Sequence, residues 1–333
     1  MNRPSGFALI ALLGTLLGSC ANLPPNGVST PAAAPSAISS ASAVTTQRPS
    51  PAPGWPTDGW PTSRPEDQGL DPQTLAEMLA TIQARRLNLH SLLVIRNGTL
   101  VSETYFGPYQ ADTPHESYSV TKSFIATLIG IASDRGAIDQ LDRPILDFFP
   151  EQAARRDPQK QAITLEDLLT MRAGLEWEEG DAAYRALYQS PDWVEFMLER
   201  PMAGPRGKVF NYCSGCSHLL SALLESATGM NPRAFAEETL FGPLGIRSAR
   251  WATDSAGIPI GGWGLQLTPR DMAKLGYLYL QRGEWAGQRI VSAQWVEAAI
   301  QTHTPTEDDL GYGYQWWTYP ALGAYAALGR GDR

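Results

Sequence analysis

Lysine is scarce in this chain, and its scarcity excludes one large class of partners. The 333 residues carry a formal net charge of −8, and they contain no basic run. The lysines are Lys122, Lys160, Lys208 and Lys274. A protein that binds nucleic acid neutralises phosphates with clustered lysine and arginine side chains. We therefore expect no nucleic acid among the partners of this protein.

Histidine is also scarce, and its spacing argues against a metal site. The histidines are His90, His115, His218 and His303, and none has the HExxH or a comparable ligand spacing. A GxSxG nucleophile elbow is absent as well, which disfavours a Ser-His-Asp α/β-hydrolase. We predict neither a metal nor a cofactor.

Two of the three cysteines form a C-x-x-C pattern, Cys213 and Cys216, in front of an apolar helical stretch. A thiol oxidoreductase carries its reactive pair in such a position, so redox catalysis is a rival function. No thioredoxin-like βαβ pattern surrounds these cysteines, however. We expect a local disulfide or two packed thiols.

The third cysteine, Cys20, ends a segment that is typical of an export signal. Arg3 precedes the apolar stretch FALIALLGTLLG, which is too short to span a membrane as a mature helix. The following Leu17-Gly18-Ser19-Cys20 resembles a bacterial lipobox, which implies that Cys20 is lipidated and anchors the protein in the cell envelope, facing the periplasm. The alternative is a plain secretory signal, which would leave a soluble periplasmic or secreted protein.

Composition divides the chain into three parts. Residues 1–20 form the signal peptide, and residues 21–63 are rich in Pro, Ala, Ser and Thr, which predicts a disordered tether. Residues 64–333 form the folded domain. Within it, helical and loop patterns over about residues 134–262 predict a helical insertion. The oligomeric state does not follow from these patterns.

The rest of the folded domain mixes helix and strand signals, as an α+β fold does. Asp71 and Pro72 begin an amphipathic helix predicted over residues 71–86. The β-rich runs on either side of Asn97-Gly98 predict an antiparallel hairpin. Strand character returns in YGYQWWTY and GAYAALG. We expect an antiparallel sheet flanked by terminal helices.

The motif YSVTKS places Ser119 and Lys122 just before the apolar stretch FIATLIGIA. If a helix begins near Ser119, Lys122 lies one turn along on the same face, with Cβ atoms about 5 to 6 Å apart. Partial desolvation lowers the pKa of such a lysine and makes it a base for the serine hydroxyl. Free N–H groups at the helix N-terminus suit an oxyanion. The alternative is a helix-capping Ser119 and a surface Lys122.

A second polar segment, FNYCSGCS, contains Tyr212 and Ser214 in front of another apolar helix. Tyr212 can pass a proton between nucleophile and leaving group, with Lys122 holding its phenolate form. A core tyrosine in a tight turn is the alternative. The acidic, aromatic loop over residues 176–181 is interpreted as solvated rather than as a substrate-binding rim.

In their order along the chain, several segments resemble the serine β-lactamase and penicillin-recognising superfamily, and more narrowly its class C-like esterases and 6-aminohexanoate-dimer hydrolases. The segments are SVTKS, ITLEDLLTMRAGLEW, Tyr212-Cys213-Ser214 before LLSALLESATG, and GLQLTPRDMAKLGYLYL. The likeness covers about residues 65–333. It implies a β-lactamase-like fold in which Ser119 is acylated, Lys122 activates it and Tyr212 shuttles the proton.

The resemblance also implies substrate-binding residues. Ser214 occupies the second polar position of the family's YxN or YxS motif, and serine there favours an esterase or amidase over a lactam hydrolase. Gly329-Arg330-Gly331 is the counterpart of the KTG-like motif, which makes Gly329 and Gly331 substrate-binding residues on the strand beside the site. The last strand and the C-terminal helix of the family are missing, so we expect a truncated C-terminus.

The expected function is hydrolysis of a small-molecule ester or amide bond, β-lactams included, through an acyl-enzyme on Ser119. A different class of function remains open. A non-catalytic envelope lipoprotein with the same fold would bind peptidoglycan or a partner protein in its cleft.

Overall fold

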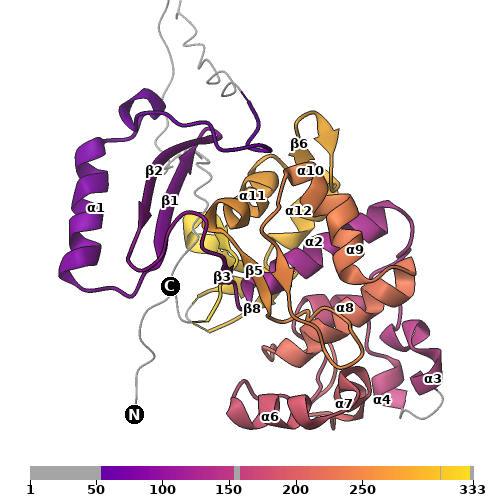
Figure 1. The fold of residues 1–333 in the computed structure, drawn as a ribbon. Helices are drawn as coiled ribbons and strands as arrows, with labels where there is room; N and C mark the ends of the chain where they lie inside the picture. The colour runs from indigo at the N-terminus through magenta and orange to yellow at the C-terminus, as the bar shows by residue number, and fades with distance from the viewer. Residues whose placement is uncertain (1–53, 154–157, 308, 331–333) are drawn as a thin grey trace, which may run out of the picture.

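A computed structural model describes residues 54–153, 158–307 and 309–330. The signal peptide with Cys20, residues 21–53 of the predicted tether and Gly331 lie outside the described residues. The hairpin with α1 lies on one side of the molecule, helices α3 to α9 lie on the other, and α2 runs between them (Figure 1).

Residues 54–63 differ from the expectation of a tether that reaches residue 63, because they pack against the folded domain. Thr62 forms a parallel bridge with Leu100, and the Leu100 N–H donates to the Pro61 carbonyl at 2.8 Å. The Trp60 side chain is 8% exposed, and its Nε1 donates to the Arg270 carbonyl at 3.0 Å. The tryptophans of this segment supply the apolar area that its Pro- and Ser-rich neighbours lack.

The first elements match the sequence prediction closely. Helix α1 spans Pro72–Ala84, and the Asp71 side chain caps it by accepting from the Gln73 and Thr74 N–H groups. Strands β1, Ser91–Arg96, and β2, Thr99–Tyr105, form an antiparallel hairpin. Asn97 and Gly98 both have positive φ, at 51° and 76°, which is the conformation of a two-residue type I′ turn.

Helix α2, Val120–Asp134, is the central helix of the core. Every residue from Val120 to Ala132 is buried, so this helix is enclosed on all sides rather than amphipathic. It packs against α8, Ser214–Thr228, whose first eleven residues are also buried. The two helices that carry the SxxK and YxS segments are therefore neighbours in the core.

The remaining helices lie mostly in the middle of the chain. They are η1 (Glu66–Gln68), η2 (Ile145–Phe148), α3 (Pro150–Ala153), α4 (Pro158–Gln161), α5 (Leu165–Leu169), α6 (Asp181–Gln189), α7 (Trp193–Glu199), α9 (Pro232–Ala236), η3 (Glu237–Phe241), α10 (Gly242–Leu244), α11 (Pro269–Leu280), α12 (Ala293–Ala299) and η4 (Pro320–Leu322). Within the described ranges, no helix is long and apolar enough to cross a bilayer.

The strands form several separate antiparallel sets. Beside the hairpin there are a set in the order β3-β5-β4, a pair β6-β7 and a set in the order β11-β10-β9-β8. Their bounds are β3 (His115–Glu116), β4 (Arg250–Trp251), β5 (Leu265–Leu267), β6 (Glu284–Trp285), β7 (Gln288–Arg289), β8 (Thr304–Pro305), β9 (Gly311–Tyr312), β10 (Trp317–Tyr319) and β11 (Ala324–Ala326). No described strand joins the hairpin to β11, so the single sheet expected from the sequence is divided here.

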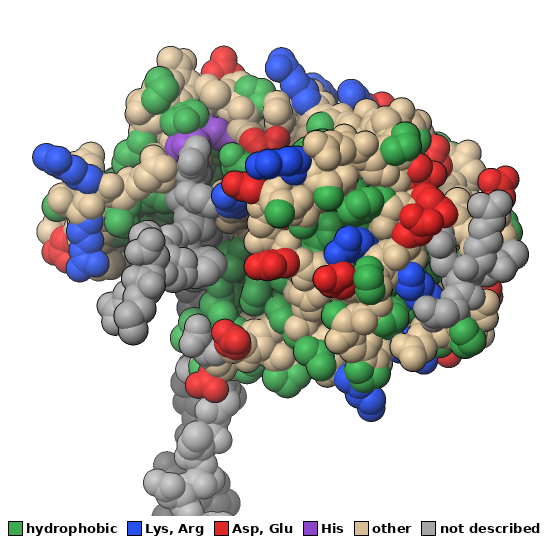
Figure 2. Space-filling model, turned by 90° about the horizontal axis from the view of Figure 1, so that it is seen from below, with side chains coloured by type: hydrophobic (Ala, Val, Ile, Leu, Met, Phe, Trp, Pro, Cys, Tyr) green, Lys and Arg blue, Asp and Glu red, His purple; other side chains and the backbone are tan. Residues whose placement is uncertain are grey.

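Side-chain contacts connect the hairpin to the rest of the domain instead. Glu103 on β2 accepts two hydrogen bonds from the Arg270 guanidinium on α11, at 2.7 and 2.6 Å. Acidic and basic side chains are interspersed over the face in Figure 2, with no large patch of one sign. The mixed antiparallel sheets and helices confirm the α+β fold class.

Candidate active site

Ser119 and Lys122 meet at the N-terminus of α2, as their spacing predicts. Ser119 is the N-cap residue, but its side chain makes no capping hydrogen bond. Its Oγ instead accepts a hydrogen bond from Lys122 Nζ at 2.9 Å. Lys122 is 1% exposed. The alternative of a capping serine and a surface lysine is therefore wrong.

Lys122 Nζ is held by three oxygen acceptors. In addition to Ser119 Oγ it donates to Ser214 Oγ at 2.9 Å and to the Gly262 carbonyl at 2.8 Å. Burial lowers the pKa of Lys122 to about 7, and the negative charge of Glu179 opposes this change. A large fraction of the side chain is thus a neutral amine at physiological pH, which can accept a proton from Ser119.

Tyr212 lies on the other side of the amine. Lys122 Nζ is 4.8 Å from the centroid of the Tyr212 ring, and the Tyr212 hydroxyl forms a hydrogen bond with Ser119. The ring is stacked on Trp317, with centroids 5.8 Å apart. Burial raises the pKa of Tyr212 far above its usual value, and the hydrogen bond with Ser119 only partly opposes this. Burial therefore favours the neutral phenol over the expected phenolate in the resting protein.

The backbone before the nucleophile has a strained conformation. Tyr118 has φ 46°, in the left-handed region that side chains other than glycine rarely adopt. The Glu116 carboxylate holds this turn, because its Oε1 accepts from the Tyr118 N–H at 3.2 Å and from the Gly264 N–H at 2.9 Å. Within the described part of the chain the Ser119 N–H has no partner, so it can donate to an oxyanion.

The segment after β11 reaches the same turn. A Cβ on Gly329 would lie 2.6 Å from the Ser117 carbonyl oxygen, so only glycine fits this approach. The charge of Arg330 acts on Tyr184, whose hydroxyl donates to Glu179. The structure thus brings Gly329 to the nucleophile turn together with Ser119, Lys122, Tyr212 and Ser214.

Two groups in the site were not predicted from the sequence, the Gly262 carbonyl and the Glu179 carboxylate. The Gly262 carbonyl contacts Lys122, although nothing in the sequence around Gly261-Gly262 marks an acceptor. Glu179 was assigned to a solvated loop, but its Oε1 accepts from the Ser214 N–H at 2.7 Å and from Trp177 Nε1 at 2.7 Å. The carboxylate and indole two residues apart in EWEEG were the available signal.

Aromatic side chains surround this cluster on the side of α6 and α7. Tyr184 packs edge-on against Trp263 and Trp177, with ring centroids 4.9 and 5.8 Å apart. Trp263 Nε1 donates to the Tyr188 hydroxyl at 2.9 Å, and Tyr188 is 57% exposed. Because Trp263 follows Gly262 directly, this aromatic group lies next to the acceptor of Lys122.

The cysteines Cys213 and Cys216 form a disulfide at the start of α8. This confirms one of the two expected states of the pair. Both residues are at most 2% exposed, so the sulfurs are not accessible to a redox partner. Their function here is to fix the backbone between Tyr212 and Ser214.

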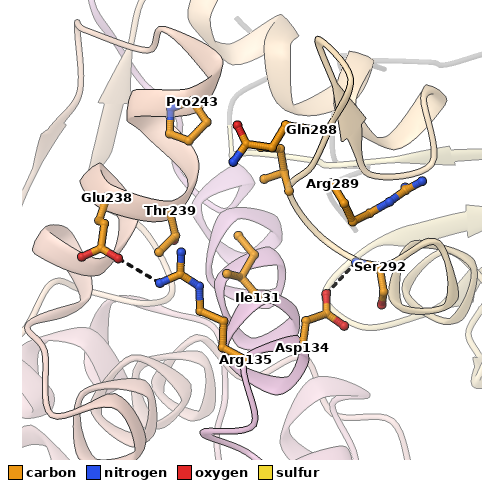
Figure 3. Close-up of a pocket in the computed structure, with 10 residues that line it drawn as sticks. Ile131, Asp134, Arg135, Glu238, Thr239, Pro243, Gln288, Arg289 and Ser292 are labelled. Atoms are coloured by element: carbon orange, nitrogen blue, oxygen red, sulfur yellow. Dashed lines mark hydrogen bonds and ion pairs between the residues drawn. The ribbon is translucent and has the colours of Figure 1, made fainter.

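Two further features do not belong to this cluster. The described residues include no group of three or more side chains that could hold a metal ion. A pocket of about 410 Å³ lies at the other end of α2, where Arg135 pairs with Glu238 and the Ser292 N–H donates to Asp134 (Figure 3). Arg289, which also lines the pocket, pairs with Glu284, so the charged groups of this pocket already have partners.

Comparisons with known proteins identify relatives of this chain. A 6-aminohexanoate-dimer hydrolase from Paenarthrobacter ureafaciens is 26% identical over 282 residues, which cover 74% of this chain and 71% of that protein. The esterase/beta-lactamase LipL from Mycobacterium tuberculosis is 28% identical over 172 residues, covering 48% of this chain and 38% of LipL. A solved Bacillus anthracis structure, described as a 6-aminohexanoate-dimer hydrolase, superposes with a TM-score of 0.65 at 25% identity and covers 75% of this chain and 70% of its own.

The sequence model of the Beta-lactamase family matches residues 75–331, a range that includes Ser119, Lys122, Tyr212 and Ser214. The match extends over most of the chain and over both helices that carry the cluster. Related hydrolases share the fold. The chain therefore belongs to the Beta-lactamase family.

Proposed function

We propose that this protein is a serine hydrolase that cleaves a small-molecule ester or amide bond through an acyl-enzyme on Ser119. One observation carries the proposal. The amine of Lys122 is buried, has a pKa of about 7 and lies 2.9 Å from the Ser119 hydroxyl oxygen. A base of this proton affinity in contact with a serine is what nucleophilic catalysis at neutral pH requires.

The reaction follows from the contacts. Neutral Lys122 takes the Ser119 proton as Oγ attacks the substrate carbonyl, and the oxyanion accepts from the Ser119 N–H. Tyr212, which is in contact with Ser119, gives its proton to the leaving alkoxide or amine and regains one from the Lys122 ammonium. Water then attacks the acyl group by the same proton transfers in reverse, which restores Ser119 and releases the acid.

The names of relatives support an ester or a linear amide as the substrate. One relative is a 6-aminohexanoate-dimer hydrolase and another an esterase/beta-lactamase. Serine at position 214, where β-lactamases commonly carry asparagine, also supports the esterase or amidase branch. The aromatic side chains beside Gly262 support an acyl group with apolar character.

A fluorophosphonate probe tests the proposal directly. We expect one covalent adduct per protein, located on Ser119 by peptide mass spectrometry and absent in Ser119→Ala. Ser123→Ala is the matched control, because Ser123 lies in the same helix but donates to the Gln315 carbonyl, away from the cluster. A folded protein that gives no adduct, or that keeps its adduct in Ser119→Ala, would exclude the proposed mechanism.

We also propose that the protein is exported and lipid-anchored through Cys20. The disulfide between Cys213 and Cys216 supports an oxidising compartment. In a bacterial host, the full chain should fractionate with membranes, and Cys20→Ser should move it to the soluble fraction. Equal partitioning of the two proteins would contradict the anchor.

A further inference from the structure

Glu179 connects three parts of the site by hydrogen bonds. Its carboxylate accepts from the Ser214 N–H and from Trp177 Nε1, both at 2.7 Å, and from the Tyr184 hydroxyl. Ser214 in turn accepts from Lys122 Nζ through its Oγ at 2.9 Å. Glu179 is therefore connected to the amine through one intervening residue, Ser214.

The hydrogen bonds to this carboxylate all have the same direction. All three partners donate, so an acceptor-only carboxylate satisfies them without a proton of its own. The group nevertheless belongs to a residue that is exposed to solvent, so its charge is hydrated on one side. An ionised group held in this way costs little and acts on its neighbours through space.

We propose that Glu179 is a positioning residue of the site, which holds the Ser214 backbone in place and supplies the negative charge that balances the Lys122 ammonium. The inference rests on the proposed function of Lys122 as the base. Its consequence is that Glu179 sets the pH above which the enzyme works, without contacting the substrate bond.

The other titratable groups around the amine do not supply this charge. Burial raises the pKa of Tyr184, Tyr212 and Tyr312, so all three are neutral phenols at physiological pH. Arg330 acts on Tyr184 and is a cation, so it cannot supply a negative charge. Within the described residues, Glu179 is the charged side chain that acts on Lys122, and it favours the ammonium form.

Glu179→Gln removes the charge and keeps the shape. The glutamine oxygen still accepts from the Ser214 N–H and Trp177 Nε1, and its amide can donate to the Tyr184 hydroxyl. We expect the pKa of Lys122 to fall by about one further unit, because a nearby opposite charge has been removed. The acid limb of the rate of Ser119 labelling by the fluorophosphonate should move to lower pH by the same amount.

Carbon-13 NMR of lysine Cε measures the titration of Lys122 without any turnover. The chain has few lysines, so Lys122→Arg assigns the resonance. Glu178→Gln is the control, since it makes the same change in net charge at the neighbouring residue, and it should leave both the titration and the labelling profile unchanged. Glu179→Ala should lower the labelling rate at every pH as well, because the Ser214 N–H loses its acceptor.

The outcomes separate the two proposals. An unmodified protein that is not labelled at Ser119 contradicts the proposed function. A protein that is labelled normally, but whose Lys122 titration and acid limb are the same in Glu179→Gln, contradicts the inference alone. The same holds if the limb moves to higher pH, or if Glu178→Gln moves it equally.

Discussion

Lys122 is an ionisable side chain that is buried away from water, and its burial lowers the free energy of unfolding. The pKa of Lys122 is about 7 in the folded protein, against an ordinary value of 10.5 for a lysine in water. Between these two pH values the unfolded chain binds the proton and the folded protein does not, so stability increases as pH rises from about 7 to 10.5. The full effect is on the order of 5 kcal/mol.

We therefore expect Lys122→Met to abolish Ser119 labelling. It should also raise the free energy of unfolding at pH 6.5 by about 1 to 4 kcal/mol, because an apolar side chain replaces a buried charge. The gain should be smaller at about pH 9.5, because the cost of burying the amine falls as pH rises from about 7, where the folded lysine loses its proton, towards 10.5. Urea unfolding of both proteins at the two pH values measures this. A gain that is equal at both would mean that the buried amine is not the source of the cost.

Tyr212→Phe should remove the proton relay and keep the packing. The ring still stacks on Trp317 and lies beside Lys122, so we expect a change of less than about 1 kcal/mol in stability. Ester turnover should fall by about 10² to 10⁴, because a general acid–base group is lost. Steady-state hydrolysis of a p-nitrophenyl ester, with thermal unfolding as the control, tests this. Full ester turnover in Tyr212→Phe would mean that another group donates the proton to the leaving group.

Local spacing predicted the part of the site that local structure builds. Ser119 and Lys122 meet because they are one helical turn apart, and Tyr212 and Ser214 flank the start of the next buried helix. The Gly262 carbonyl and the Glu179 carboxylate reach Lys122 and Ser214 from loops far away in the sequence. No periodicity marks such contacts, so only the tertiary structure finds them.

At the scale of elements, the loop over residues 261–264 is fixed by its close approach to α8. A Cβ on Gly261 would lie 2.1 Å from the Ser217 carbonyl oxygen, and one on Gly262 would lie 2.6 Å from that of Ser214. The loop therefore has glycines where backbone meets backbone. This contact is what aims the Gly262 carbonyl at Lys122.

Gly261→Ala should push the loop away from α8. We expect a loss of about 1 to 3 kcal/mol in stability, typical of an overpacked position, together with slower Ser119 labelling. Gly204→Ala is a suitable control, because a Cβ there has no neighbour within 4 Å. Urea unfolding and labelling rates compare the two. A Gly261→Ala protein as stable and as reactive as the control would contradict this role of the loop.

The sequence indicated the early elements well, since their signals are local. The Asp71 cap, Pro72 and the Asn97-Gly98 turn predicted α1 and the β1–β2 hairpin nearly to the residue. The pairing of the strands could not be predicted from the sequence in the same way. Strands such as β3, β4 and β8 are two residues long, which is too short for alternation to be read, and their partners are remote.

At the scale of the whole molecule, residues 54–63 belong to the folded domain. Trp60 packs on Tyr277 of α11, with ring centroids 5.5 Å apart, and Thr57 Oγ1 accepts from Trp285 Nε1 at 2.8 Å. Composition assigned these residues to the tether because proline and serine dominate it. The two tryptophans, Trp55 and Trp60, were the sign that burial was possible.

We predict that a domain beginning at Gly54 is more stable than one beginning at Arg64. Trp60→Ala in the longer chain should cost about 3 to 5 kcal/mol, as for other buried tryptophans. Thermal and urea unfolding of the three proteins measure this. Leu322→Ala is the control in the longer chain, because its side chain is 62% exposed, and it should be nearly neutral. Equal stability of the two domains would mean that residues 54–63 do not contribute to the stability of the folded domain and belong with the tether.

The carboxylate of Glu116 has a consequence for how new specificities can arise in this protein. It ties the turn before Ser119 and the loop after Gly262 together through their backbone N–H groups, and this contact involves none of the exposed side chains of α6. Tyr188, an exposed residue of α6, contacts this loop through the hydrogen bond from Trp263 Nε1 to its hydroxyl. A combinatorial library at exposed α6 positions would therefore sample different substrate ranges while every member inherits the same reactive serine.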